Sequence, residues 1–240
     1  MQYAMLSELG GRPINEDYVG NVISGAETGC FVLCDGLGGH GHGEVASKFV
    51  TDSILGEYKI KGNSSDFIRD AVTVAQDGLL RLQKEKHTQS EMKTTVVVLK
   101  VMNDKVEWSH IGDSRLYYFE KKKVAERTLD HSVPQILVAA GEIKEKDIRH
   151  HPDRNRLLKV MGAPWSEKEP FRIEVKERTD KQAFLLCSDG FWELIDEKYM
   201  QKYLKKAKTP MEWLNLMTKM VLKNGQDTEM DNYSAIAVWL

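Results

Sequence analysis

The chain has 240 residues, of which 41% are hydrophobic and 29% are charged, so it can bury a sizeable core beneath a charged surface. Its formal net charge of -2 gives no electrostatic reason to expect a nucleic-acid partner. Apolar runs such as 95–99 are far shorter than the roughly 18 residues that suggest a membrane span, and the N-terminal residues lack the basic start and apolar core of a signal peptide.

Two short strands are predicted at the start of the chain, over residues 3–9 and 18–24. Between them lies a polar turn whose glycines and proline enforce a loop. The turn carries Arg12 and two adjacent acids, Glu16 and Asp17. In isolation, such a turn is typical of a solvated connection.

Residues 31–34 form an unbroken apolar run, which is typical of a strand buried on both faces. The run ends at Asp35, and from Gly36 onward closely spaced glycines permit backbone angles that other residues avoid. A carboxylate at the tip of a buried strand, beside exposed backbone carbonyls, suits a hard cation. Helical spacing then predicts two helices, the first on Ala46, Phe49, Val50, Ser53 and Ile54, the second, capped by Ser65, on Phe67, Ala71, Val74, Ala75 and Leu82.

The middle of the chain is rich in β-branched and aromatic residues. These predict three strands, which we interpret as an antiparallel meander: 94–102, 106–111 and 116–119. The lysines at 121–123 indicate a solvated turn in the next hairpin. A short helix over 132–140 is stopped by Gly141, and a polar surface excursion follows as far as Arg156.

The last part of the chain repeats the earlier device. An apolar run over 183–187 ends at Asp189-Gly190, as the first run ends at Asp35-Gly36. Further strands are predicted over 171–176 and 234–240, and further helices begin near Asp196 and at Thr209, where Pro210 and Glu212 complete a capping box. Two successive helices followed by strands favour an α+β arrangement over repeated βαβ units.

The three cysteines bear on the compartment. Cys30, Cys34 and Cys187 lie in apolar runs and lack the CxxC spacing of a metal or redox site. We interpret them as small buried hydrophobic residues in a reducing environment. The sequence therefore predicts a cytoplasmic protein.

Acids recur at the ends of the apolar strands: Asp17, Asp35, Asp113, Asp189 and Asp231. Any one of them alone is typical of a turn residue or a helix cap. If several converge, two like charges about 4 Å apart repel by roughly 4 kcal/mol at an effective dielectric near 20. Such a cluster needs a cation, and oxygen-only ligands favour Mg²⁺ or Mn²⁺ over zinc.

Other motifs compete with this interpretation. The segment 36–41 matches G-x-G-x-x-G, but no second strand ends in an acid about 20 residues further on. Ser114 with His150 resembles a serine esterase pairing, yet that pairing leaves the Asp-Gly strand ends unexplained. Two histidine pairs lack a suitable third metal ligand nearby and are interpreted as solvated: His40-x-His42 and His150-His151.

Six motifs then occur in a fixed order along the chain: Arg12-x-x-Asn15-Glu16-Asp17, Asp35-Gly36-x-Gly38-Gly39-His40, Gly112-Asp113-Ser114-Arg115, Leu129-x-His131-Ser132, Ser188-Asp189-Gly190 and Asp231-Asn232. Together they resemble the metal-dependent (type 2C, PPM) serine/threonine protein phosphatases, and the short chain is similar to bacterial members. The resemblance spans nearly the entire chain, and the ordered set is far more specific than any single motif.

The resemblance implies an α+β fold, a four-layer α-β-β-α sandwich of two mostly antiparallel sheets flanked by helix pairs. It implies a single catalytic domain over residues 1–240, and no Pro/Ser-rich linker argues for splitting the chain. Residues 132–162 resemble the family's flap, which borders the active site.

The resemblance also implies a centre of two divalent ions, Mn²⁺ or Mg²⁺, in each chain. Asp35 would be the bridging carboxylate, with Asp189 and Asp231 on one metal. Glu16 and the Gly36 carbonyl would serve the other metal.

Three further residues receive roles from the same resemblance. Asp17 would order bound water, and Asp113 is similar to the acid that helps to hold a third, weaker metal in bacterial members. Arg12 offers a planar fork for two phosphate oxygens, which a lysine could not reproduce. Two divalent ions neutralise the phosphate and align a bridging water for in-line attack, without a covalent intermediate.

The chain departs from the family pattern at two places. Leu37 stands where eukaryotic relatives carry a histidine general acid, so the proton donor stays open between a metal-bound water and His40. Lys93-Thr94-Thr95 replaces the usual Gly-Thr-Thr, which we interpret as a tolerated turn change.

The predicted function is therefore metal-dependent hydrolysis of phosphoserine and phosphothreonine in proteins. The alternative is a non-catalytic module of the same fold that binds phosphoproteins, whose signature would be the loss of a metal acid. The expected partners are phosphorylated substrates of a bacterial serine/threonine kinase. We expect no nucleic acid and no membrane span, and because the sequence gives no sign of an oligomer, we expect a monomer.

Overall fold

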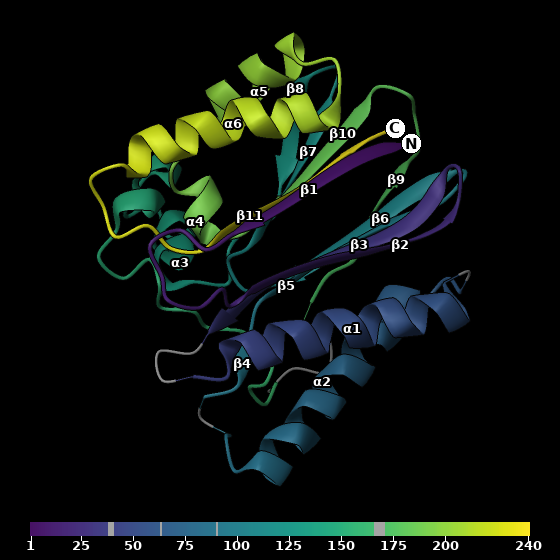
Figure 1. The fold of residues 1–240 in the computed structure, drawn as a ribbon, viewed down its shortest axis with the longest axis vertical. Coiled ribbons are helices and arrows are strands. Elements are labelled where there is room, and N and C mark those ends of the chain that lie inside the picture. The colour runs from purple at the N-terminus through teal and green to yellow at the C-terminus, as the bar shows by residue number, and fades with distance from the viewer. Residues whose placement is uncertain (38–40, 63, 90, 166–170) are drawn as a thin grey trace.

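A computed structural model describes residues 1–37, 41–62, 64–89, 91–165 and 171–240. Two β-sheets lie face to face, and helices cover both outer surfaces (Figure 1). This is the α+β sandwich that the sequence predicts. Gly38, Gly39 and His40, and with them part of the G-x-G-x-x-G match, lie outside the described residues. No helix in the described ranges is both long and apolar enough to cross a membrane.

The first sheet has five antiparallel strands and brings both ends of the chain together. Its strands, in spatial order, are β1 (Gln2–Glu8), β11 (Tyr233–Trp239), β10 (Gln182–Cys187), β7 (Arg115–Glu120) and β8 (Lys123–Arg127). Gln2 is the pairing partner of Trp239, so β1 and β11 match along their whole length. The β7–β8 hairpin turns at Lys121 and Lys122, as the lysine run predicts, and both have positive φ.

The second sheet is also antiparallel. Its path is β2 (Asp17–Gly25), β3 (Thr28–Leu37), β5 (Val96–Val101), β6 (Lys105–Ile111) and β9 (Glu174–Glu177), with β4 (Lys93–Thr94) paired to the end of β3. The predicted strand 94–102 is therefore broken at Thr95, and β9 is shorter than the predicted 171–176.

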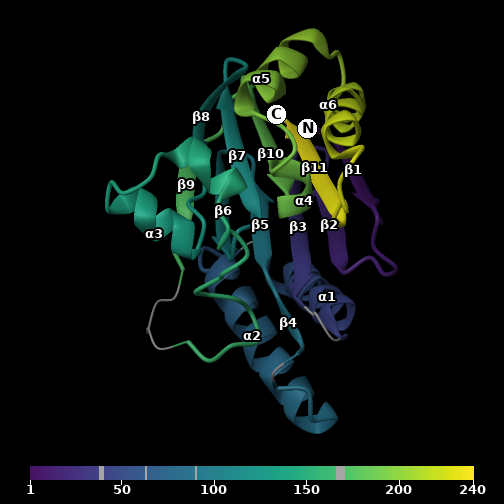
Figure 2. The same cartoon turned by 90° about the vertical axis from the view of Figure 1, so that its left-hand side faces the viewer.

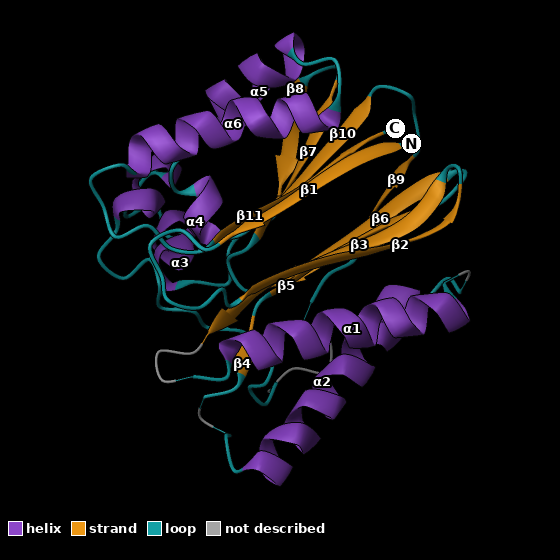
Figure 3. Ribbon diagram, in the orientation of Figure 1, coloured by secondary structure: helices purple, strands orange, loops and turns teal. Residues whose placement is uncertain are grey.

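The helices form the outer layers (Figure 3). α1 (Gly43–Lys61) and α2 (Phe67–Lys86) cover the second sheet, whereas α4 (Asp189–Trp192), α5 (Glu197–Lys206) and α6 (Pro210–Gly225) cover the first. α3 (Val133–Ala139) and the 3-10 helix η1 (Glu145–His150) lie at one side of the sandwich (Figure 2).

Strand β3 is buried on both faces because it is packed on both sides. Phe31 and Leu33 face the first sheet and join a core cluster with Phe184 of β10. The alternate residues Val32 and Cys34 face α1 and α2. Because side chains alternate between the two faces of a strand, β3 contributes residues to two separate hydrophobic cores. All three cysteines are buried free thiols, as the sequence predicts.

Two details of the helix predictions are wrong. α2 is preceded by Asp66 rather than Ser65, and the Ser65 hydroxyl donates to the Asp66 carboxylate instead of capping the helix. Val74 is 41% exposed, because the buried stripe of α2 runs through Ile68, Val72 and Leu79. The one-turn helix α4 has too few residues to show a periodic pattern.

The predicted meander over 94–119 is also wrong. β5 and β6 pair in the second sheet, but β7 lies in the first. The chain crosses between the sheets at Gly112, whose φ of +106° is open to glycine and rarely to other residues. A Cβ there would lie 2.6 Å from Cγ2 of Thr95. The crossing places Asp113 on the seam between the sheets, that is, on the segment that leads from β6 of the second sheet to β7 of the first.

Candidate metal centre

The predicted site residues other than Asp17 come together on loops and strand ends near the start of α4. They line a cavity of about 400 Å³, which includes Arg12, Glu16, Asp35, Gly36, Asp113, Asp189 and Asp231. Asp17 does not line this cavity. It is buried and is the cross-strand partner of Asp35.

Asp35 is fixed through its backbone. Its N–H donates to the Thr95 hydroxyl at 3.0 Å, and its carbonyl accepts from the Thr95 N–H and the Thr94 hydroxyl, each at 2.8 Å. Both threonines of the Lys93-Thr94-Thr95 segment therefore hold the carboxylate-bearing residue in place. The lysine that departs from the family pattern takes no part in these bonds, which agrees with a tolerated change.

Gly36 and Glu16 meet through their backbones. The Gly36 N–H donates to the Glu16 carbonyl at 3.0 Å. A Cβ on Gly36 would lie 2.4 Å from the carbonyl of Gly43 and 2.7 Å from the carbonyl oxygen of Glu16. Only glycine therefore fits where the end of β3, the β1–β2 loop and the start of α1 meet.

Asp17 is tied to the other sheet by a serine. The Ser188 hydroxyl donates to the Asp17 carboxylate at 2.8 Å and accepts from the Ser234 N–H at 2.9 Å. Ser188 also immediately precedes α4, whose first residue is Asp189. One hydroxyl therefore connects an acid of the second sheet to the strand ends of the first.

Asn232 organises the loop that carries Arg12 and Glu16. Its side-chain oxygen accepts from the Glu16 N–H at 2.8 Å, and its amide donates to the carbonyls of Leu9 and Ile14 at 2.8 and 3.0 Å. The sequence singled out Asp231-Asn232 as a motif, but it assigned no role to the asparagine. Its role depends on tertiary contacts across the chain, which no local pattern reports.

Arg12 bonds to an acid of the site. Its guanidinium lies 2.8 Å from the Asp231 carboxylate, and the two side chains are 52% and 40% exposed. The two residues therefore meet at the mouth of the cavity, where the arginine remains open to solvent.

The buried carboxylates raise one another's pKa. Burial raises the pKa of Asp17 to about 7, although hydrogen bonds from Ser234 and Ser188 oppose the rise, and burial followed by repulsion from Asp231 raises that of Asp189 to about 6. The pKa values of Asp35 and Asp113 lie well above the usual range, first through burial and then through neighbouring aspartates. Burial and repulsion from Glu44 and Asp231 raise the pKa of Glu16.

This donor set fits a hard divalent cation. It consists of oxygens only, and its buried negative charges oppose one another, which is the arrangement that Mg²⁺ and Mn²⁺ favour. Among the described residues, however, no three histidine, cysteine or acidic side chains already close around a common point.

A buried arginine holds the loop that carries Asp113. Arg115 donates to both oxygens of Asp130 at 2.8 and 2.7 Å, and its guanidinium lies 3.3 Å from the ring centroid of Trp192. The Trp192 indole N–H in turn donates to the Asp113 carbonyl at 3.0 Å. Arg115 receives no role from the sequence, and Trp192 is not singled out there, because both act through tertiary contacts that leave no local sequence pattern.

Among the described residues, the serine esterase alternative finds no support. The Ser114 hydroxyl is buried and paired with the Thr95 hydroxyl at 2.7 Å, so it is not presented as a nucleophile. Nδ1 of His151 accepts from the Asp153 N–H, an ordinary local turn contact. His40 lies outside the described part of the chain.

Residues of the 132–162 segment border the site. Asn155 and Leu157 line the acid-lined cavity. A second cavity of about 500 Å³ adjoins it, and Arg149 and Arg154 line this one together with Asp189. The arginines are held by acids of the helical layer, Arg154 by Glu193 at 3.1 Å and Arg149 by Glu197 at 2.6 Å.

Two antiparallel sheets whose shared end holds a cluster of buried carboxylates form the framework of a metal-dependent hydrolase. The family model described as protein phosphatase 2C matches residues 10–232. The chain therefore belongs to this family and is a metal-dependent serine/threonine protein phosphatase.

Bacterial phosphatases are similar over most of the chain. A serine/threonine phosphatase of Listeria monocytogenes is 28% identical over 224 residues, which cover 90% of this chain and 88% of the relative. The crystal structure of a serine/threonine phosphatase from Staphylococcus aureus is 29% identical with a TM-score of 0.86, and covers 99% of this chain and 94% of its own. A phosphatase catalytic domain solved with two manganese ions is 25% identical with a TM-score of 0.80, and covers 98% of this chain and 96% of its own.

Proposed function

We propose that this enzyme releases phosphate from phosphoserine and phosphothreonine through a centre of two divalent cations, Mn²⁺ or Mg²⁺, in the acid-lined cavity. The observation that carries the proposal is the set of buried carboxylates that share this cavity and raise one another's pKa. Asp35 would bridge the two cations. Asp189 and Asp231 would bind one of them, and Glu16 with the Gly36 carbonyl would bind the other.

Two more acids support this centre. Asp17 lies buried behind Asp35 and would order water bound to the cations. Asp113, on the seam between the sheets, would hold a third, weaker cation. Divalent cations held by these residues would supply neutralisation of the phosphate charge and activation of water for in-line attack.

Arg12 would bind the substrate phosphate. Its exposed guanidinium stands at the mouth of the cavity, and its planar fork matches two phosphate oxygens. Binding requires the guanidinium to exchange Asp231 for the phosphate. Leu37 also lines the cavity but carries no proton to donate, so the leaving group must take its proton from another source.

The adjoining cavity offers a place for the peptide around the phosphorylated residue. It is contiguous with the site through Arg12, Asn155, Asp189 and Asp231, which line both cavities. Residues 132–162 would act as a flap over this peptide within a single catalytic domain of residues 1–240. The substrates would be cytoplasmic proteins phosphorylated by a bacterial serine/threonine kinase, and the enzyme would act as a monomer.

The test is phosphate release from a phosphothreonine peptide with Mn²⁺, with Mg²⁺ and with a chelator. Asp35→Asn and Asp189→Asn are compared with the exposed control Asp52→Asn, with folding checked by circular dichroism. We expect turnover that needs added metal and vanishes in both site variants only. Folded wild-type protein that releases no phosphate with either metal would refute catalysis and favour a non-catalytic phosphoprotein-binding module.

A further inference from the structure

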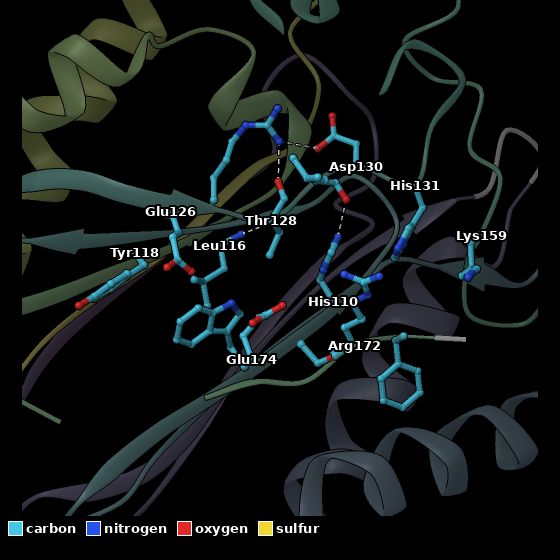
Figure 4. A pocket seen from close by; sticks show the side chains of 15 residues that line it. His110, Leu116, Tyr118, Glu126, Thr128, Asp130, His131, Lys159, Arg172 and Glu174 are labelled. Carbon is cyan, nitrogen blue, oxygen red and sulfur yellow. Dashed lines mark hydrogen bonds and ion pairs between the residues drawn. The ribbon is translucent and has the colours of Figure 1, made fainter. Parts of the chain in front are cut away.

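Two stacked imidazoles lie behind the loop that carries Asp113. The rings of His110 and His131 are parallel within 6°, with centroids 4.6 Å apart. They form part of the wall of a separate cavity of about 550 Å³ between the sheets (Figure 4). Nε2 of His110 lies 2.8 Å from the Leu129 carbonyl, and this contact fixes the His110 ring.

His131 holds both polar groups of Gly112. Its ring Nδ1 accepts a hydrogen bond from the Gly112 N–H at 3.1 Å, and the backbone N–H of His131 donates to the Gly112 carbonyl at 2.9 Å. Because Nδ1 accepts, the neutral ring carries its hydrogen on Nε2. Burial, followed by His110 and Lys159, lowers the pKa of His131 to about 3, so the ring remains an uncharged acceptor.

Gly112 needs such support. Its φ of +106° and its close approach to Thr95 restrict the backbone conformation at this position. The His131 ring supplies the hydrogen-bond acceptor for its N–H. Asp113 follows directly, and its own carbonyl accepts from the Trp192 indole. The backbone is thus fixed on both sides of the carboxylate, by His131 before it and by Trp192 after it.

We propose that His131 is a positioning residue for Asp113, acting through the Gly112 peptide to aim that carboxylate at the cation site. The inference rests on the proposed function in one respect, the binding of a weaker cation by Asp113. Loss of a group that orients a metal ligand lowers metal affinity about 10- to 100-fold in typical cases. His131 touches no reacting atom, so its effect would appear in cation binding before it appears in chemistry.

Three variants separate the acceptor from the ring. His131→Phe keeps a ring that can stack on His110 but removes the acceptor. His131→Asn removes the ring but places an amide oxygen where Nδ1 stood. His110→Phe is the matched control, because it makes the same substitution in the partner ring, whose hydrogen bond is to the Leu129 carbonyl and not to Gly112.

Two measurements are made on each variant. The Gly112 amide proton is observed by NMR in metal-free protein, and Mn²⁺ binding is measured by isothermal titration calorimetry. In His131→Phe we expect an upfield shift of the Gly112 amide proton and a loss of about 10-fold or more in affinity at the weakest Mn²⁺ site. His131→Asn should keep the weak-site affinity within about threefold of wild type, as should His110→Phe.

The outcomes distinguish the two proposals. A folded His131→Phe that binds Mn²⁺ like wild type, or a His131→Asn that loses as much as His131→Phe, would overturn the role of His131. If His131→Phe does not fold, His131→Gln replaces it, because its longer amide places the acceptor away from Gly112. Wild-type protein without turnover, but with this pattern of Mn²⁺ binding, would refute the proposed function and retain the inference.

Discussion

Replacing Asp189 by asparagine should stabilise the metal-free protein at neutral and alkaline pH. The folded protein holds this carboxyl with a pKa of about 6, against an ordinary value of 3.8, because of burial and repulsion from Asp231. A raised acid pKa means that the folded state binds the proton more tightly than the unfolded state. The stability contributed by this group is therefore complete below about pH 4 and is lost as the pH rises through 6.

The shift sets the magnitude of the effect. A change from 3.8 to about 6 corresponds to roughly 3 kcal/mol, at 1.36 kcal/mol for each pKa unit. Asparagine has nearly the same shape and can still accept from the Gly190 N–H, but it carries no charge. We therefore expect Asp189→Asn to be about 3 kcal/mol more stable than wild type at pH 8, and equal to it near pH 4.

The assay is urea unfolding of metal-free protein at intervals between pH 4 and pH 8. The lowered pKa values of His110 and His131 change stability in the opposite direction, since their neutral folded forms lose stability as the pH falls below 6.5. These contributions are common to both proteins and cancel in the difference. Asp52→Asn, which removes an exposed partner of Lys48, should change stability by less than about 0.5 kcal/mol.

Saturating Mn²⁺ should reverse the order of the two proteins. A ligand at 1,000 times its Kd stabilises the folded state by about 4.1 kcal/mol, which exceeds the roughly 3 kcal/mol gained by the substitution, and Asp189→Asn removes one of the proposed metal-binding carboxylates. A stability difference that does not change with pH, or a destabilised Asp189→Asn at pH 8 without metal, would refute the electrostatic account of the site.

Three other substitutions test separate parts of the structure. Arg12→Lys should raise the KM for a phosphopeptide about 10-fold in steady-state kinetics, because lysine lacks the planar fork of the guanidinium. The melting temperature should not change, because the Arg12–Asp231 ion pair is exposed, and an unchanged KM would contradict phosphate binding by Arg12. Gly36→Ala should lower the unfolding free energy by about 2 kcal/mol in urea, since its Cβ would overlap the Gly43 carbonyl, and unchanged stability would contradict that close approach. Arg115→Met should cost about 3 to 5 kcal/mol by calorimetry, because it leaves Asp130 buried without its main partner; a loss below about 1 kcal/mol would show that this pair does not hold the loop.

Much of the fold is predictable from local patterns in this chain. The apolar run 31–34 predicts a strand buried on both faces, and it is packed between a second sheet and two helices. The Thr209 helix begins where its cap predicts, and the Thr209 hydroxyl accepts from the Glu212 N–H. The aspartates of the Asp-Gly pairs at two strand ends, Asp35 and Asp189, line the same cavity.

Tertiary contacts account for what the sequence could not predict. The predicted meander is wrong at Gly112 because antiparallel strands with similar apolar patterns can either continue one sheet or begin another. That choice depends on a single left-handed residue and on its contacts. Likewise, Asn232 bonds to Glu16, which is 216 positions away in the chain, and Trp192 bonds to Asp113, which is 79 positions away. Such contacts leave no periodic trace around either residue.

The seam on which the site lies has a mechanical consequence. Asp35 follows the apolar run of β3 in the second sheet and Asp189 follows that of β10 in the first, and a core of apolar side chains lies between the two sheets. A cation shared by these two acids would join the layers in the manner of a reversible cross-link. Separation of the sheets would then require the ion to leave first, so amide hydrogen exchange in β3 and β10 should slow when Mn²⁺ is added. The same ion would thus govern both the rate of phosphate release and the lifetime of the folded enzyme.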